Sequence, residues 1–279
     1  MLSIKIMSKE DLAFAVNITD TMSWDLIEED FKFMMKLEPE GCFVLLNGSE
    51  RVGIATTISY GRIGWLGNLI ISENHRKKGA GALMVRHSLE YLKKKNVETV
   101  GLYAYIHTIP FYEKIGFQYD SEFTVLEGEG RSSPPQTAVT EIRQENLQRI
   151  IDFDKLCLGA SRKKLLEPIL RDSNNPGYIS TRNGEITGYA ATKVYNGTAE
   201  VGPLVCLKEH DEVVIDLLKA TLLRLEGHHV SMCIPRKEFR ILTLLKDSGF
   251  DEKFYVARMF CGYPFFKDCI HLAESLERG

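Results

Sequence analysis

The chain has 279 residues, of which 44% are hydrophobic and 26% are charged, a balance typical of soluble globular proteins. Its formal net charge of -3 leaves no broad basic surface, so we expect no nucleic-acid partner. There is no apolar run after a basic start at the N-terminus, and no apolar stretch long enough to cross a bilayer, so we expect neither a signal peptide nor a membrane partner. The six cysteines lie far apart without a CxxC pair, which fits a reducing cytoplasm and argues against a zinc site or a disulfide framework.

Helices and strands are predicted in alternation along the first half, which indicates an α/β layer fold. Capping residues and apolar periodicity predict helices over 8–21, 25–37 and 79–95, and a short helix that ends at Gly116. Apolar runs between turn signals predict strands over 41–46, 51–60, 65–71, 97–105 and 123–128. Residues 129–138 are rich in Gly, Ser and Pro, as is typical of a linker. We therefore expect two domains, 1–130 and 137–279, with few contacts across the linker.

The spacing of glycines suggests that the second half repeats the first. In the first half, separations of 12, 14 and 49 positions relate Gly41, Gly53, Gly67 and Gly116. In the second half, separations of 11, 14 and 47 positions relate Gly177, Gly188, Gly202 and Gly249. With 22 glycines such quartets also arise by chance, but the flanks agree, VGIATT with TGYAAT and YEKIGF with LKDSGF. The pattern therefore favours a duplication.

The stretch RKKGAG, which begins at Arg76, lies between a predicted strand and a predicted helix. At such a junction several backbone N–H groups point outward at the positive end of the helix dipole, where they can bind a pyrophosphate. Glycine at positions 79 and 81 lets the backbone approach phosphates closely, and three basic residues add positive charge. The P-loop pattern is absent, and the dinucleotide pattern GxGxxG fails because Met84 stands at its sixth position. The alternative is an ordinary surface turn.

This stretch resembles the acetyl-CoA signature of the GNAT superfamily of acetyltransferases, RxxGxG after an apolar strand, with Arg76, Gly79 and Gly81 at its fixed positions. FYEKIGF, which begins at Phe111, looks like the superfamily's second signature, and a helix and a strand separate the two as they do in the superfamily. The stretches SWDLIEED, PEGCF, GASR, VGP and ARMFCG are similar to a two-domain subgroup of these enzymes. The resemblance implies tandem GNAT folds, each a mixed, mostly antiparallel twisted sheet flanked by helices.

The resemblance also implies direct attack of a primary amine on the thioester of acetyl-CoA, the co-substrate, without a covalent enzyme intermediate. The residues expected to bind acetyl-CoA are Arg76, Lys77, Lys78, Gly79, Ala80 and Gly81. Backbone N–H groups of Leu69, Ile70 and Ile71 match the family's position for polarising the thioester carbonyl. Tyr112 matches the tyrosine that serves the departing thiolate, because a phenol with a pKa of about 10 is a suitable proton donor. Its alternative role is aromatic packing of a helix on the sheet.

The acceptor site of this fold usually has a wall near the start of the helix predicted over 25–37. The candidate residues there are Trp24, Asp25, Glu28, Glu29 and Asp30. Spacing puts Asp25, Glu28 and Glu29 near one helix face, and Trp24 could stack on a substrate. A solvated acidic face and a packed tryptophan are the alternatives. No general base is assigned, and no metal is expected because the seven histidines lack metal-ligand spacing with acidic or thiol partners.

The second half lacks the features that bind acetyl-CoA in the first. There is no glycine between Gly202 and Gly227, where the loop should stand, and carboxylates within 209–212 would repel phosphate. The counterpart of Tyr112 is Leu245. We expect the second domain to be a degenerate GNAT-like domain that lacks the RxxGxG loop and binds no cofactor. It would form a wall of the acceptor site or take the place of a dimer partner.

Three functions fit these observations. The first is an N-acetyltransferase that acts on a small primary amine, and the intact strand ends and Tyr112 favour it. The second is an acetyl-CoA-binding sensor or regulatory protein whose second half recognises a protein partner. The third is a protein or peptide acetyltransferase, because the acidic helix start suits basic peptides as well as polyamines or aminoglycosides. We expect a cytoplasmic monomer or homodimer.

Overall fold

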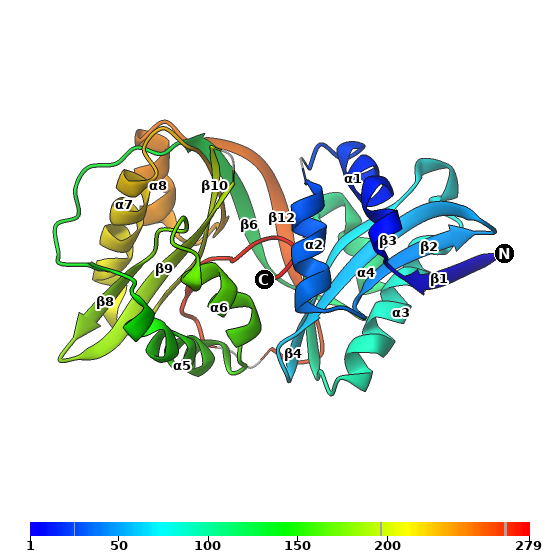
Figure 1. Cartoon of the computed structure of the whole chain (residues 1–279), viewed down its shortest axis with the longest axis horizontal. Coiled ribbons are helices and arrows are strands. Elements are labelled where there is room, and N and C mark those ends of the chain that lie inside the picture. Colours follow the sequence, from blue (N-terminus) through cyan, green and yellow to red (C-terminus); the bar gives the residue numbers. More distant parts are fainter. Residues whose placement is uncertain (25, 196, 265–266) are drawn as a thin grey trace.

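The structure, a computed structural model, describes residues 1–24, 26–195, 197–264 and 267–279. In these residues 13 strands form one continuous sheet, which helices cover on both faces (Figure 1). The elements of the first half are β1 (Leu2–Ile6), α1 (Leu12–Asp20), α2 (Glu28–Leu37), β2 (Cys42–Asn47), β3 (Glu50–Ser59), β4 (Ile63–Ile71), α3 (Ala80–Lys94), β5 (Thr99–Tyr105), α4 (Ile109–Glu113) and β6 (Gln118–Glu129). Those of the second half are β7 (Thr140–Glu141), α5 (Leu147–Leu158), α6 (Lys163–Arg171), β8 (Tyr178–Arg182), β9 (Glu185–Tyr195), β10 (Thr198–Cys206), α7 (Val214–Arg224), β11 (His229–Pro235), α8 (Phe239–Asp247), β12 (Asp251–Cys261) and β13 (Ile270–Leu272).

The same order of elements therefore occurs twice, and β13 is an addition at the end of the second half. Each pair of neighbouring strands is antiparallel except β4 with β5 and β10 with β11, which occupy matching places in the two halves. The mixed, mostly antiparallel sheet flanked by helices is the fold class that the sequence predicted.

Local chemistry sets the starts of the first two helices. The N–H and Oγ of Ser8 both donate to Asp11 Oδ2 at 2.8 Å, so the predicted cap is present, although 9–11 is a 3-10 turn that precedes α1. The second helix begins at Glu28 rather than at 25, because Asp30 Oδ2 accepts a hydrogen bond from the Ile27 N–H at 2.9 Å. Position 25 itself lies outside the described residues.

The two halves exchange their last long strands. In the sheet β12 of the second half lies between β5 and β6, and β6 pairs on its other edge with β11. Figure 1 shows β6 and β12 side by side across the middle of the molecule. Residues 131–139 contain no helix or strand, as predicted for a linker, but the strands on either side of it interlock. The expectation of few contacts between the halves is therefore wrong.

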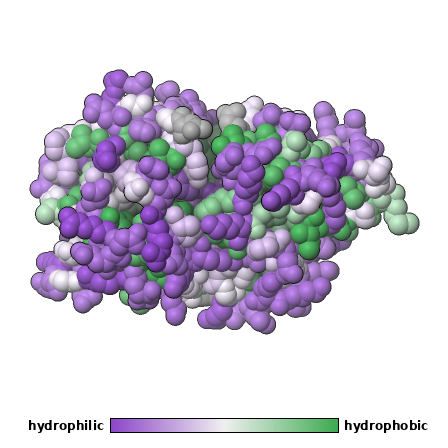
Figure 2. Space-filling model, in the orientation of Figure 1, coloured by the Kyte–Doolittle hydropathy of each residue, from purple (hydrophilic) through white to green (hydrophobic). Residues whose placement is uncertain are grey.

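Three large apolar clusters follow from this arrangement. On one face of the sheet, α1 and α2 of the first half and α5 and α6 of the second half pack into a single shared core. On the other face the two cores are separate, one under α3 and α4 and one under α7 and α8. The shared core and the exchanged strands fix the two halves against each other. Polar and charged side chains cover most of the face shown in Figure 2, with smaller hydrophobic patches among them.

The segment 270–279 runs from the second half into the first and ends in the middle of the molecule (Figure 1). A Cβ on Gly202 would collide with the backbone oxygen of Ala273, and a Cβ on Gly67 would lie 2.6 Å from the backbone oxygen of Glu277. Glycine at both positions lets this segment pass against β10 and β4. These contacts give a physical reason for two of the glycines that recur in the repeat.

Candidate functional site

The parallel strands β4 and β5 separate part-way along their length. They pair from Ile63 opposite Thr99 to Trp65 opposite Gly101, and beyond these residues both strands continue without pairing to each other. A slot therefore opens between residues 66–71 of β4 and 102–105 of β5. Backbone groups that face such a slot are free to bond a ligand that enters it.

A β-bulge lies in β4 at the mouth of this slot. Gly67 pairs with Thr56 and Ile70 pairs with Ile54, so Asn68 and Leu69 together face one residue of β3. Asn68 has a positive φ of 50°, and its Nδ2 donates to Thr56 Oγ1 at 3.1 Å. A bulge leaves a residue outside the ladder and redirects its backbone groups. The predicted group Leu69, Ile70 and Ile71 lines a cavity at this point.

The predicted phosphate loop lies between the end of β4 and α3. Gly79 is the N-cap of α3 and has a φ of +84°, a conformation that favours glycine, and the space around the position of its missing Cβ is open. The first N–H that bonds back into the helix is that of Leu83, to Gly79 O at 3.0 Å, so the preceding turn presents its N–H groups outward. Residues 76–79 are exposed, including the basic side chains of Arg76, Lys77 and Lys78. The loop thus has the geometry and charge of an anion site.

Two residues of the loop have contacts that the sequence did not predict. A Cβ on Gly81 would lie 3.3 Å from the ring of Phe111, so this glycine admits α4 as well as a ligand. The side chain of Arg76 turns back toward β4, where its Nε donates to Ile71 O at 2.7 Å. Arg76 therefore holds the loop against the end of the bulged strand.

Tyr112 lies on α4 and lines the same cavity as the β4 bulge. It is 9% exposed, and its ring packs edge-on against Phe117 and Phe111 with centroids 5.7 and 4.9 Å away. Burial raises the pKa of the Tyr112 phenol above its ordinary value, so the hydroxyl stays protonated at neutral pH. The side chain is thus packed and also faces the cavity.

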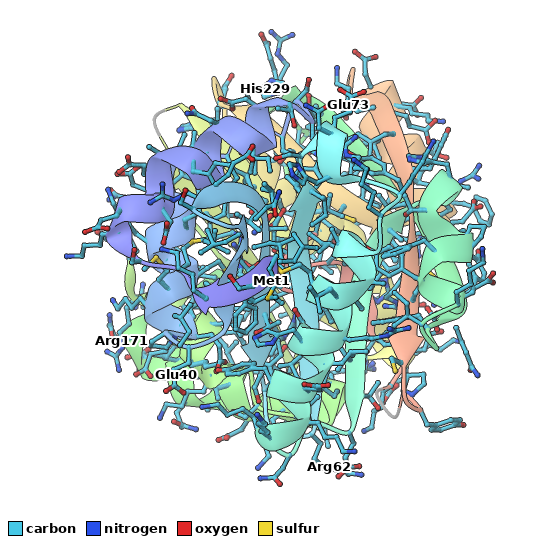
Figure 3. All side chains as sticks on the ribbon, turned by 90° about the vertical axis from the view of Figure 1, so that its right-hand side faces the viewer. Met1, Glu40, Arg62, Glu73, Arg171 and His229 are labelled. Atoms are coloured by element: carbon cyan, nitrogen blue, oxygen red, sulfur yellow. The ribbon has the colours of Figure 1, made fainter. Side chains whose placement is uncertain are left out.

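The cavity has a volume of about 740 Å³ and is lined by both halves of the chain. One side consists of the β4 bulge, Arg76, Tyr112 and the turn before α2, and the other consists of parts of β10, β11 and β12 together with 276–278. In Figure 3 Glu73, which precedes the loop, and His229, which lines the cavity, lie at the same end of the molecule, opposite Arg62. The exchanged strands therefore bring the loop and the second half to one site.

The predicted acceptor residues do not all reach this cavity. Trp24 lines it, and its Nε1 donates to Tyr105 Oη at 2.7 Å. Glu28 and Glu29 lie on the outside of α2, where both pair with Lys32, at 3.0 and 3.3 Å. Among the described residues of α2, the carboxylate that lines the cavity is Asp30, one position beyond the predicted helix face.

The second half contributes charged groups that sequence reasoning did not assign. Burial raises the pKa of Glu200 on β10, although Lys193 and Arg278 oppose the shift. Burial also raises the pKa of Asp30, which comes from α2 of the first half. Burial alone would also raise the pKa of Glu274, but Arg278 and Lys193 lower it to about 2. Carboxylates with perturbed pKa values in a cavity are typical of functional sites. No local pattern marks Glu200 or Arg278, because the strand exchange and the final segment bring them to the cavity.

The corresponding slot of the second half is filled by the chain itself. Strands β10 and β11 pair over three residues and then separate, and β13 lies between them. Cys206 N–H donates to Cys269 O at 2.9 Å, and Ala273 N–H donates to Cys233 O at 3.0 Å, so this segment bonds to both strands. Residues 270–273 therefore occupy the place that is open between β4 and β5.

Two further substitutions distinguish the second slot from the first. The bulge of β10 falls at Gly202 and Pro203, and proline has no N–H to present where the first half has Asn68. Leu245 occupies the position of Tyr112. The Phe250 N–H donates to Leu245 O at 2.9 Å, as the Phe117 N–H donates to Tyr112 O at 3.1 Å. Leu245 is fully buried in the core of the second half.

The described residues contain neither a metal-ligand group nor a helix that could span a membrane. They contain no group of three or more His, Cys, Asp or Glu side chains arranged to hold a metal ion. None of their helices combines the length and apolarity needed to cross a bilayer.

Comparison with known proteins adds independent information on the two halves. A family model described as the acetyltransferase (GNAT) family matches residues 5–117, and one described as an acetyltransferase (GNAT) domain matches residues 150–271. Together the matches cover more than four fifths of the chain. Holothin acyltransferase of Pseudoalteromonas sp. (strain SANK 73390) is 24% identical over 243 residues, which are 86% of this chain and 81% of that protein.

Solved structures show the same fold over almost the whole chain. A putative acetyltransferase from Pyrococcus horikoshii superposes with a TM-score of 0.81 at 22% identity, covering 100% of this chain and 96% of its own. A tandem GNAT protein from the clavulanic acid biosynthesis pathway superposes with a TM-score of 0.62 at 12% identity, covering 93% of this chain and 98% of its own. Both family matches, the acyltransferase relative and the shared fold lead to one conclusion: the chain belongs to the GNAT acetyltransferase family, carries two GNAT domains in tandem, and is an acyltransferase.

Proposed function

We propose that this protein is an N-acetyltransferase that moves an acetyl group from acetyl-CoA to a small primary amine by direct attack, at a single site in its first GNAT domain. The observation that carries the proposal is the convergence of three features on one cavity. They are the open slot of β4 and β5 with its bulge, the glycine-capped loop before α3, which reaches the cavity through Arg76, and the Tyr112 side chain.

The first domain supplies the binding and polarising groups. The N–H groups before Leu83 and the side chains of Lys77 and Lys78 would hold the pyrophosphate, Arg76 would hold the loop in place, and the open space at Gly79 leaves room for the ligand. The slot beside residues 66–71 would take the extended pantetheine arm, whose amides can bond to the unpaired edge of β4. At the bulge, the N–H groups of 69–71 would face the thioester oxygen and stabilise the negative charge that develops there.

Proton transfers complete the reaction. The attacking amine must be neutral, because an ammonium has no lone pair, and a carboxylate of the cavity would take its proton. Tyr112 would give a proton or a hydrogen bond to the departing thiolate, since burial keeps the phenol protonated. The concave, partly aromatic cavity between the two domains favours a small amine over a protein acceptor.

The proposal is tested with the purified full chain, acetyl-CoA and a panel of primary amines, by following thiol release and the mass of the product. We expect acetylated amine from the wild type, and we expect Gly79→Ala to weaken acetyl-CoA binding roughly 10-fold or more because its Cβ enters the pyrophosphate space. Gly184→Ala is the matched control, with a φ of +82° and the same open surroundings but a place in the second domain. It should carry the same backbone strain and keep wild-type affinity. Absence of acetyl transfer to every amine, or equal binding losses in both variants, would contradict the proposal.

A further inference from the structure

Four carboxylates line the cavity, and two of them are neutralised by neighbouring cations. Glu200 pairs with Lys193 and lies 3.5 Å from Arg278. Glu127 lies 3.9 Å from the ammonium of Lys253 and 3.5 Å from His229. These two carboxylates therefore have partners within the protein and do not require a charged ligand.

The other two, Asp30 and Glu277, have no ion-pair partner within 4.0 Å in the part of the chain that the structure describes. Asp30 comes from α2 of the first domain and Glu277 from the final segment of the second, and both are half-buried. Arg278 in the same cavity is paired with Glu274 and lies 3.5 Å from Glu200, so half-buried carboxylates without an ion-pair partner of their own favour binding of further positive charge. The site thus contains two carboxylates without a direct ion-pair partner, one from each domain.

An unpartnered acceptor atom in the same cavity also requires a donor. Asn68 is 6% exposed and lines the cavity, and its Oδ1 has no hydrogen-bond partner among the described residues. A buried amide oxygen without a partner costs free energy unless a ligand N–H or O–H reaches it. Asn68 lies in the β4 bulge, beside the proposed thioester position.

The walls between these polar groups are aromatic. Trp24 and Tyr105 are held together by the hydrogen bond between Nε1 and Oη, and Phe254 lies against Tyr105 with ring centroids 5.6 Å apart. Aromatic faces accept both methylene groups and ammonium groups. Such walls suit an alkyl chain with a cationic end.

Glu277 is the carboxylate nearer the reacting end of the cavity, because its backbone lies directly against Gly67, one residue before the bulge. The neighbouring Arg278 fixes this segment, since its Nε donates to Glu274 at 2.9 Å and its carbonyl oxygen accepts from Tyr60 Oη at 2.9 Å. Asp30, at the start of α2, belongs to the turn that walls the cavity on the acceptor side. The two free carboxylates thus have different positions relative to the bulge.

We propose that the acceptor is an alkyl diamine, with one ammonium group held by Asp30 while the other lies at Glu277 and reacts. This proposal rests on the proposed acetyl transfer. The reacting ammonium gives one proton to the Glu277 carboxylate, and the neutral nitrogen attacks the thioester carbon. A C–N bond forms, the C–S bond breaks, and the thiolate takes a proton from Tyr112. The nitrogen gives its second proton to the Tyr112 phenolate, which leaves a neutral amide, and Glu277 releases the first proton to solvent. The overall change is one ammonium and one thioester to one amide, one thiol and one proton.

The test compares three acceptors of similar length with the full chain and acetyl-CoA: putrescine, n-pentylamine, in which a methyl replaces the second ammonium, and γ-aminobutyrate, in which a carboxylate replaces the terminal aminomethyl group. We expect kcat/KM for putrescine to exceed that for n-pentylamine by roughly 10²-fold, and γ-aminobutyrate to be the poorest. Equal values for putrescine and n-pentylamine would overturn the proposal and leave the acetyl transfer intact. A preference for γ-aminobutyrate would overturn it as well.

Two variants separate the roles of the carboxylates. Asp30→Asn should raise KM for putrescine and bring the ratio of the two amines toward unity, whereas Glu277→Gln should mainly lower kcat, by roughly 10²-fold. Glu40→Gln, an exposed carboxylate outside the cavity and labelled in Figure 3, should change neither. Wild-type putrescine preference in Asp30→Asn would overturn the proposal.

Calorimetric binding of putrescine in the presence of coenzyme A gives a readout that does not need turnover. Binding that depends on Asp30 without any acetyl transfer would support the diamine site and overturn the proposed reaction. No binding of putrescine would overturn the diamine site.

Discussion

Replacement of Tyr112 by phenylalanine is expected to lower kcat by roughly 10²-fold or more, with little change in the affinity for acetyl-CoA. The substitution keeps the ring, which packs against Phe111 and Phe117, and removes only the hydroxyl of a side chain that lines the cavity. The phenol is then no longer available to the departing thiolate. Steady-state kinetics with a saturating amine give kcat, and calorimetry with acetyl-CoA gives the affinity.

Tyr119→Phe is the matched control for this experiment, because Tyr119 is 49% exposed on β6 and does not line the cavity. It should behave as the wild type in both measurements. If Tyr112→Phe also kept the wild-type kcat under conditions where the chemical step limits turnover, Tyr112 would have a packing role alone.

Replacement of Arg162 by alanine is expected to lower the free energy of unfolding by about 3 to 5 kcal/mol. Arg162 is 1% exposed and Asp154 is fully buried, and the guanidinium donates to both carboxylate oxygens, at 2.6 and 3.1 Å. Tyr189 Oη also donates to Asp154, at 2.6 Å, and Arg162 Nη1 donates to the Gly279 backbone oxygen at 2.7 Å. Without the guanidinium, a buried carboxylate would keep one neutral donor and the final segment would lose an anchor.

Urea unfolding at neutral pH measures this loss. Arg171→Ala removes an arginine from an exposed i,i+4 pair with Glu167, so it should cost less than about 1 kcal/mol. A comparable, small loss in Arg162→Ala would show that the buried pair contributes little beyond what a surface pair contributes.

Local sequence patterns were sufficient to predict the elements and the loop. The alternation of helices and strands, the cap at Ser8 and the glycine-capped start of α3 each depend on neighbours in the chain, and the structure contains all of them. The duplication was also predictable from the spacing of the glycines. The structure gives a reason for two of them, since Gly67 and Gly202 both admit the final segment of the chain. The roles of the loop residues and of Tyr112 remain predictions that rest on motif and geometry together.

The strand exchange was not predictable from the sequence. Strands β6 and β12 have the same place in each repeat, so nothing in their own residues says whether each pairs within its own domain or with the other. The choice depends on contacts between residues far apart in the chain. The same is true of β13, whose three residues carry no sign that they fill the slot between β10 and β11.

The acceptor wall was only partly predictable for a related reason. Asp25, Glu28 and Glu29 were selected on the assumption that the helix begins at 25, whereas it begins at Glu28 after Asp30 caps the turn. That shift leaves Asp30 in the cavity and places Glu28 and Glu29 outside. Glu277 reaches the cavity only because the final segment crosses from one domain to the other.

A calorimetric titration of the full-length chain with acetyl-CoA tests most directly whether the first domain alone forms a cofactor site. In the second domain the slot is filled by 270–273, the bulge has Pro203 in place of an N–H donor, and the loop before α7 has no glycine. We therefore predict one acetyl-CoA bound per chain, and weaker binding at that one site in Gly79→Ala. Two molecules bound per chain, or one molecule bound with an affinity that Gly79→Ala does not change, would contradict the assignment of the site to the first domain.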